Sequence, residues 1–125
     1  MNTAMITGWG HTQFGKLDSI DLEQLFRDAA LPAIQSAGLA PADLDGVFVG
    51  HFNSGFVPQD FTAALAGLAI PELRHTPAVR LENACATGSA AVHQGIKTIE
   101  AKRARSEEHT SELPVTRSSR MPSSA

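Results

Sequence analysis

Residues 77–92 read PAVRLENACATGSAAV, and this stretch decides the fold class that the sequence predicts. An apolar segment over 77–81, of a composition typical of strands, runs into it. Small residues suited to a helix run out of it, from Ala86 to Lys102. Cys85 is the only cysteine of the 125 residues, and it falls between the two segments. The pattern therefore predicts a thiol on a strand-to-helix turn, at the N-terminal end of a helix.

The predicted position of Cys85 favours a nucleophile. Unpaired backbone N–H groups and the positive end of the helix dipole stabilise a thiolate at such a place. The thiolate is the nucleophilic form, so an acyl-transfer enzyme that uses cysteine would carry it on such a turn. Glu82 and Asn83 are expected to orient the turn or simply to cap the helix. The alternative for Cys85 is a small buried side chain that fills a gap between strand and helix.

The rest of the chain alternates predicted strands and helices. Besides the strand and the helix that flank Cys85, strands are expected at 3–7 and 47–49, and helices at 22–37 and 59–68. Asp21 is the expected N-cap of the first helix, and Gly38 is its expected stop. The order β-α-β-α-β-α indicates an α/β fold with a largely parallel sheet. In such sheets nucleophiles sit at the C-terminal ends of strands, where Cys85 falls.

Composition argues against several classes of function. The formal net charge is −3, which is not basic enough to predict a nucleic-acid partner. One cysteine allows no disulfide within the chain, which fits a reducing compartment. The N-terminus lacks the pattern of a signal peptide, and the longest apolar stretch, Phe61 to Ile70, is too short to cross a bilayer. We therefore expect a cytoplasmic protein with no membrane or nucleic-acid partner.

Three segments in order resemble one protein family. The stretch ENACATGSAAV, residues 82–92, resembles the nucleophile motif of the thiolase superfamily, in the branch of the sterol-carrier-type thiolases. Residues 4–16, AMITGWGHTQFGK, are similar to that branch's first strand and following loop, and residues 39–50, which end in DGVFVG, to its second strand. Three ordered matches within residues 1–104 are specific, whereas a cysteine motif alone is not.

The resemblance implies a fold, a reaction and a set of partners. The fold would be the truncated N-terminal part of a thiolase-like αβαβα sandwich. The activity would be that of an acetyl-CoA acetyltransferase in lipid metabolism, with acyl-CoA as substrate, no separate cofactor and no metal. The Cys85 thiolate would attack a thioester carbonyl and form an acyl-enzyme. The parent protein would be a homo-oligomer.

The same resemblance implies that this chain is inactive alone. In the family the activating histidine, the second cysteine and most oxyanion donors come from the C-terminal half, and their motifs are absent from this chain. His93 cannot replace them, because it lies about 12 Å from Cys85 along the predicted helix. The alternative is a non-catalytic acyl- or lipid-binding module of the thiolase type. The presence of Cys85 argues against that alternative, because such a module needs no thiol.

The sequence changes character at Arg105. Residues 105–113 show neither helical nor strand periodicity, and residues 118–125 are polar and of low complexity. The segments RSEEHTSEL, residues 105–113, and SRMPSSA, residues 119–125, resemble two translated parts of a common short-read sequencing adapter, in order. We therefore expect residues 1–104 to be a partial thiolase N-terminal domain and residues 105–125 to be a non-native tail. A natural disordered tail is the alternative.

Overall fold

The computed structural model describes residues 3–52 and 61–101 of the chain. The helices and strands are α1 (Leu22–Ser36), β1 (Val47–Gly50), α2 (Leu65–Ala69), β2 (Ala78–Leu81) and α3 (Thr87–Glu100). Short 3₁₀ turns lie between them, namely η1 (Pro41–Asp43), η3 (Thr62–Ala64), η4 (Pro71–Leu73) and η5 (Ala84–Ala86). The segment expected to be a non-native tail lies outside the described residues.

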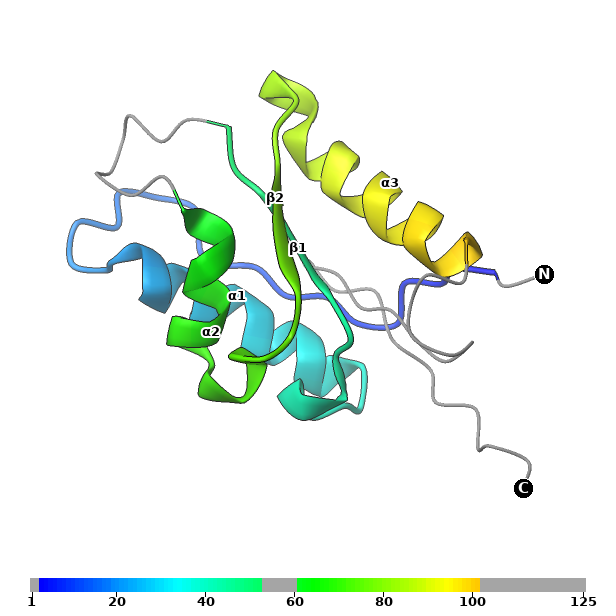
Figure 1. Ribbon diagram of the computed structural model, residues 1–125. Coiled ribbons are helices and arrows are strands. Elements are labelled where there is room, and N and C mark those ends of the chain that lie inside the picture. The colour runs from blue at the N-terminus through cyan, green and yellow to red at the C-terminus, as the bar shows by residue number, and fades with distance from the viewer. Residues whose placement is uncertain (1–2, 53–60, 102–125) are drawn as a thin grey trace.

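β1 and β2 form a parallel pair at the centre of the molecule. Val47 lies opposite Ala78, and Gly50 lies opposite Leu81. The helices α1 and α2 lie on one side of the pair, and α3 lies on the other (Figure 1). Coverage of both faces is the usual setting of parallel strands. The predicted α/β class with parallel strands is therefore confirmed.

Local hydrogen bonds fix both ends of α1. The Gln24 N–H donates to the Asp21 side chain at 2.8 Å, as the sequence predicted for the N-cap. At the other end Gly38 adopts φ +72°, and the Leu39 N–H donates to the Ile34 carbonyl at 3.1 Å. This pattern is a Schellman ending, which needs a residue in the left-handed conformation. The predicted limits of this helix are confirmed to within one residue.

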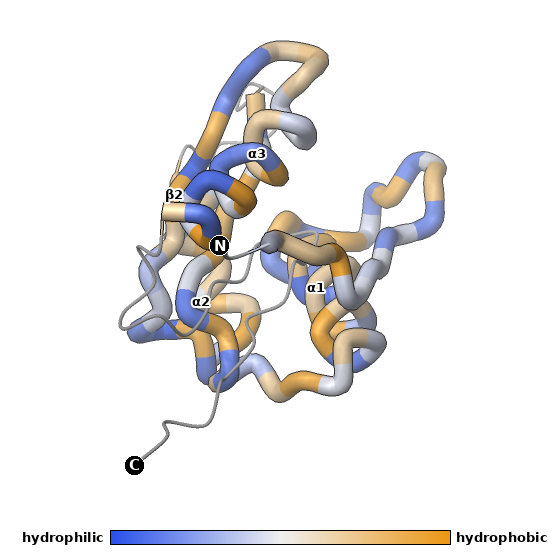
Figure 2. Tube along the Cα trace, turned by 90° about the vertical axis from the view of Figure 1, so that its right-hand side faces the viewer, coloured by the Kyte–Doolittle hydropathy of each residue, from blue (hydrophilic) through white to orange (hydrophobic). Residues whose placement is uncertain are grey.

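The hydrophobic core lies where α1 and α2 meet the strand pair. Ile34 of α1, Val47 of β1 and Leu73 of η4 are its largest fully buried side chains. Burial of each such side chain contributes roughly 1.5–3 kcal/mol. On the other side of the pair, apolar and polar residues alternate around the turns of α3 (Figure 2), so that only one face of α3 is apolar.

Residues 3–7 do not form the strand that the sequence predicted. Met5 and Ile6, which the prediction placed in that strand, are 65% and 70% exposed. A strand is defined by pairing with a neighbour, and β1 and β2 are paired only with each other in the described part of the chain. Apolar composition alone therefore does not make this segment a strand.

Two glycines allow the N-terminal segment to lie directly on the backbone of α1. A Cβ atom built on Gly8 would stand 2.3 Å from the Ala33 carbonyl oxygen, and one built on Gly10 would stand 2.6 Å from another carbonyl oxygen of the helix. The Trp9 N–H between them donates to the Ser36 hydroxyl at 3.0 Å. The N-terminal segment makes this contact through its own backbone, and a larger residue at Gly8 or Gly10 would collide with the helix.

The helix predicted at 59–68 is shorter than expected. Residues 59 and 60 lie outside the described part, residues 62–64 form the η3 turn, and α2 has only five residues. Pro71 begins the next 3₁₀ turn, which brings Arg74 back toward α2. A Cβ atom on Gly67 would stand 2.9 Å from the Arg74 Cα atom. The return of the chain at Pro71 fixes the end of α2 at Ala69, one residue beyond the predicted end, so the helix is shorter at its N-terminal end, where η3 precedes it.

Candidate functional site

Cys85 lies on the turn between β2 and α3, where the sequence predicted it. It is the middle residue of η5 and is two residues before Thr87, the first residue of α3. Its side chain is exposed. A buried cysteine that fills a gap between strand and helix, the alternative raised by the sequence, does not match this exposure. The thiol is open to a reagent or substrate from solution.

Side-chain hydrogen bonds hold the backbone just before Cys85. The Glu82 carboxylate accepts the Ala84 N–H at 2.8 Å. The Thr87 hydroxyl accepts the Asn83 N–H at 2.9 Å and donates to the Ala84 carbonyl oxygen at 2.6 Å. Ala84 itself adopts φ +43°, a left-handed conformation that a residue with a Cβ atom seldom takes. The side chains of Glu82 and Thr87 therefore fix the backbone of the turn that directly precedes Cys85.

Thr87 connects this turn to the end of the sheet. Thr87 is a buried residue, with only 6% of its surface exposed. A Cβ atom built on Gly50, the last residue of β1, would stand 2.9 Å from the Thr87 Cγ2 atom. The absence of a side chain at Gly50 is thus what lets the threonine lie against the strand. Orientation or capping by Glu82 was expected from the sequence, whereas the part played by Thr87 was not.

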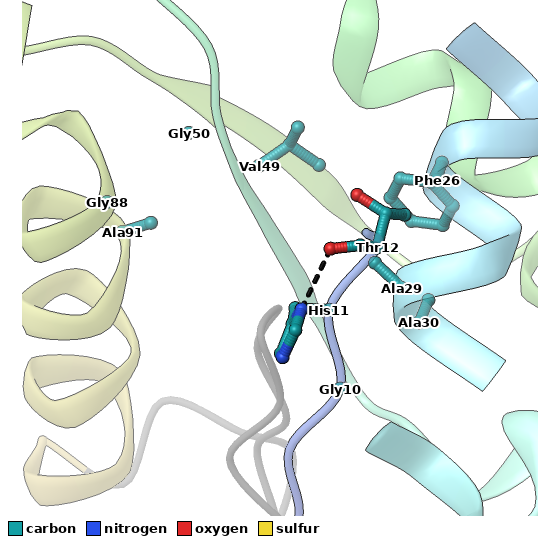
Figure 3. A pocket seen from close by; sticks show the side chains of 10 residues that line it. All are labelled: Gly10, His11, Thr12, Phe26, Ala29, Ala30, Val49, Gly50, Gly88 and Ala91. Atoms are coloured by element: carbon teal, nitrogen blue, oxygen red, sulfur yellow. Dashed lines mark hydrogen bonds between the residues drawn. The ribbon is translucent and has the colours of Figure 1, made fainter. Parts of the chain in front are cut away.

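A cleft of about 320 Å³ opens between α1, β1 and α3 (Figure 3). Its walls consist mainly of glycine, alanine and apolar side chains, with His11 and Thr12 as the polar residues. The Nδ1 atom of His11 lies 2.8 Å from the Thr12 carbonyl oxygen, which can only accept. Gly88 in the first turn of α3 lines the cleft, but Cys85 does not. The cleft therefore comes near the turn without containing the thiol.

No histidine within residues 3–52 and 61–101 forms a hydrogen bond with Cys85. His11 stacks between Trp9 and Phe14, with ring centroids 5.5 and 6.1 Å away. His51 follows β1, and its Nδ1 atom is buried without a hydrogen-bond partner. In the described part of the chain the Cys85 thiol therefore has no hydrogen bond to a histidine.

The described ranges show neither a metal cluster nor a membrane-spanning helix. These ranges hold no group of three or more histidine, cysteine or acidic side chains that could bind a metal ion together. They also contain no helix with the length and apolar character needed to cross a membrane.

Comparison with known proteins identifies the family. The model of the family described as "Thiolase, N-terminal domain" matches residues 4–106 of this chain. The match extends over far more than half of the chain, and the chain therefore belongs to the thiolase family. The matched region also contains all three segments that resemble the family in the sequence.

The curated relatives are much longer than this chain. Acetyl-CoA acetyltransferases from Methanothermobacter thermautotrophicus and Methanocaldococcus jannaschii are each 34% identical to it, over 104 and 100 residues. Each match covers 79% of this chain, but only 26% and 25% of the respective relative. The benzoylsuccinyl-CoA thiolase subunit BbsB from Thauera aromatica is 28% identical over 95 residues, which cover 75% of this chain and 23% of BbsB. The chain thus spans about a quarter of the length of these relatives.

Solved structures support the same fold. The acetyl-CoA acetyltransferase from Syntrophomonas wolfei superimposes with a TM-score of 0.68 at 18% identity, over 89% of this chain and 28% of that protein. The Acat5 thiolase from Ascaris suum, solved in complex with coenzyme A, gives a TM-score of 0.66 at 16% identity, over 87% of this chain and 27% of that protein. The structure therefore has the fold of the N-terminal portion of a thiolase.

Proposed function

We propose that Cys85 is the nucleophile of a thiolase-type acyltransferase, of the acetyl-CoA acetyltransferase kind, and that this chain is an N-terminal part of that enzyme. The observation that carries the proposal is the exposed thiol on the turn between β2 and α3. The names of the two archaeal relatives support acetyl-CoA as the substrate. The Ascaris suum thiolase in complex with coenzyme A supports an acyl-CoA ligand more generally.

The proposed first step is transfer of an acetyl group to the enzyme. The Cys85 thiolate attacks the thioester carbonyl, a bond from its sulfur to the acyl carbon forms, and the bond from that carbon to the sulfur of coenzyme A breaks. Coenzyme A leaves as a thiolate and takes up a proton. The acyl-enzyme would next react with the α-carbanion of a second acyl-CoA. Formation of that carbanion needs a base and oxyanion donors. We expect those groups from the remainder of a thiolase polypeptide, so this chain alone is expected to perform the first step at most.

The cellular setting is part of the proposal. We propose a cytoplasmic enzyme of lipid metabolism that works as a homo-oligomer and binds neither nucleic acid nor membranes. The net charge of −3 and the single cysteine support the location and the lack of nucleic-acid partners. Sedimentation of the full-length enzyme would test the oligomer.

Acylation of Cys85 tests the proposed function directly. The chain is incubated with acetyl-CoA and then analysed by intact-mass and peptide mass spectrometry. The expected product carries one acetyl group on the peptide that contains Cys85, and neutral hydroxylamine removes it because it is a thioester. Cys85→Ser is the matched control, since it keeps the size of the side chain but replaces the thiol by a much weaker nucleophile. Labelling of that variant is expected to fall to background.

One result would contradict the catalytic assignment. If iodoacetamide alkylates Cys85 readily while acetyl-CoA leaves it unmodified both in this chain and in the full-length enzyme, the thiol is accessible but is not an acyl acceptor. The non-catalytic acyl-binding module would then be the better description of the chain. Acetylation confined to lysine side chains counts as the same negative result.

We further propose that residues 1–104 are the partial thiolase domain and that residues 105–125 are a non-native tail. The proposal is supported by the two adapter-like segments in the sequence. Amplification and resequencing of the source gene across the codons for residues 101–113 tests it. A reading frame that continues into thiolase-like sequence is the expected result, and a frame that reads as printed would contradict the proposal.

A further inference from the structure

We propose that Thr87 and Glu82 are positioning residues for Cys85, because together they hold Ala84 in the left-handed conformation that turns the chain from β2 into η5. The inference rests on the proposed function of Cys85 as the nucleophile. Neither residue is proposed to touch the substrate. Both are proposed to act through the backbone on which the thiol is carried.

The backbone conformation of Ala84 must be stabilised by contacts with other residues. Its φ of +43° is the only positive φ of a non-glycine residue in the described part of the chain. The Cβ atom disfavours this conformation, which therefore persists only where surrounding contacts determine it. Since Ala84 directly precedes Cys85, its backbone angles set the direction in which the chain carries the thiol.

Both peptide groups that flank Ala84 are held by hydrogen bonds. On one side, the Ala84 N–H donates to the Glu82 carboxylate. On the other, the Ala84 carbonyl oxygen accepts from both the hydroxyl and the backbone N–H of Thr87. Fixing the two peptide planes on either side of a residue fixes both of its rotatable backbone angles. The conformation of Ala84 is thus determined by Glu82 and Thr87 together.

Thr87 is expected to contribute more than Glu82. Thr87 is a buried residue whose Cγ2 methyl group lies against Gly50, so water competes less for the hydrogen bonds of its hydroxyl than for the hydrogen bond of the exposed Glu82. The N-terminus of α3 has no side-chain cap. The hydroxyl of the first helical residue therefore bonds back to the turn and not forward to the helix. This use of a buried hydroxyl fits a role in shaping the turn.

Two substitutions at one position separate the hydroxyl from the shape of the side chain. Thr87→Val keeps the shape and removes the hydroxyl, and Thr87→Ser keeps the hydroxyl. The rate of Cys85 acetylation by acetyl-CoA is expected to fall about tenfold or more in Thr87→Val, because small misplacements of a reacting group are costly. In Thr87→Ser the rate should stay within about threefold of the original, because the hydrogen bonds are retained.

A structural measurement accompanies the kinetic one. The three-bond HN–Hα coupling and the ¹³C shifts of Ala84, measured by NMR, report whether its φ is positive. Thr87→Ser is expected to keep the positive φ, and Thr87→Val is expected to lose it. If Thr87→Val keeps both the positive φ and the original acetylation rate, the proposed role of Thr87 is overturned.

A variant at Glu82 keeps the proposal testable even if a Thr87 variant does not fold. Glu82→Ala changes an exposed side chain and leaves the core untouched. It is expected to slow acetylation severalfold and to shift the Ala84 signals, and unchanged values in both would overturn the role of Glu82. If neither the unmodified chain nor the full-length enzyme is acetylated, the proposed function of Cys85 fails. The coupling and the ¹³C shifts of Ala84 together then decide whether Glu82 and Thr87 hold its backbone.

Discussion

The two long helices, α1 and α3, have 15 and 14 residues but begin in different ways. α1 starts at a side-chain cap, Asp21, and buries Ile34 in the core. α3 starts without a side-chain cap, after a turn in which Ala84 adopts a positive φ. The helix that buries Ile34 thus begins at a side-chain cap, whereas the helix that follows Cys85 begins without a cap and after a residue with a positive φ. Such local strain is typical of functional sites.

The largest expected effect comes from the core side of this comparison. Ile34→Ala should lower the free energy of unfolding by about 2–5 kcal/mol, since Ile34 is fully buried and its removal leaves a cavity. Ile96→Ala in α3 is the matched variant, and it should cost less than half as much because Ile96 is only partly buried. Urea unfolding followed by circular dichroism measures both. Equal losses would show that α3 contributes to the core as much as α1 does.

A smaller effect is expected where the N-terminal segment lies on α1. Gly8→Ala should cost about 1–3 kcal/mol, because the new methyl group would collide with the Ala33 carbonyl oxygen and the backbone would have to shift. Gly88→Ala in α3 is the control, since no atom lies within 4 Å of the position of its Cβ. That variant should gain about 0.5–1 kcal/mol from the better helix propensity of alanine. Changes of the same sign in the two variants would contradict this account.

The smallest effect concerns the helix caps. Asp21→Ala removes the acceptor for the Gln24 N–H and should cost about 1 kcal/mol, whereas Asp21→Asn should retain most of the stability. Ala86→Ser offers α3 a hydroxyl at its own cap position, but Ala86 has φ −96° and ψ 16°, which is not the extended geometry of a side-chain cap. No gain is therefore expected. Thermal unfolding compares the three variants, and a gain from Ala86→Ser would show that α3 lacks only a suitable side chain.

Local signals explain what could be predicted of the fold. The limits of α1 follow from Asp21 and Gly38, and both act within a few residues of themselves. Residues 47–49 and 77–81 were predicted as strands and contain most of β1 and β2. The strand expected at 3–7 was wrong, because pairing depends on partners far away in the sequence. The late start of α2 was not predicted either, because residues 62–64 form the η3 turn instead of its first helical turn.

The sequence predicted where the candidate site lies between strand and helix, but not the backbone conformation of its turn. The change from strand to helix around Cys85 is visible in the sequence. The η5 turn is not, because a positive φ is uncommon for any residue other than glycine, and Ala84 adopts one. The role of Thr87 also depends on its contact with Gly50, which only the folded chain brings near. The one local signal of the role of Thr87 is its residue type: a threonine in the first helical turn has a hydroxyl that can bond back to the preceding turn.

The exposure of Cys85 makes the chain monovalent in oxidative coupling. With one sulfhydryl per polypeptide, air oxidation joins two copies and then stops, so the product is a symmetric covalent pair linked turn to turn and never a ladder of longer species. A single band of twice the mass on a non-reducing gel, lost on adding reductant, therefore reports the accessibility of this turn without any label.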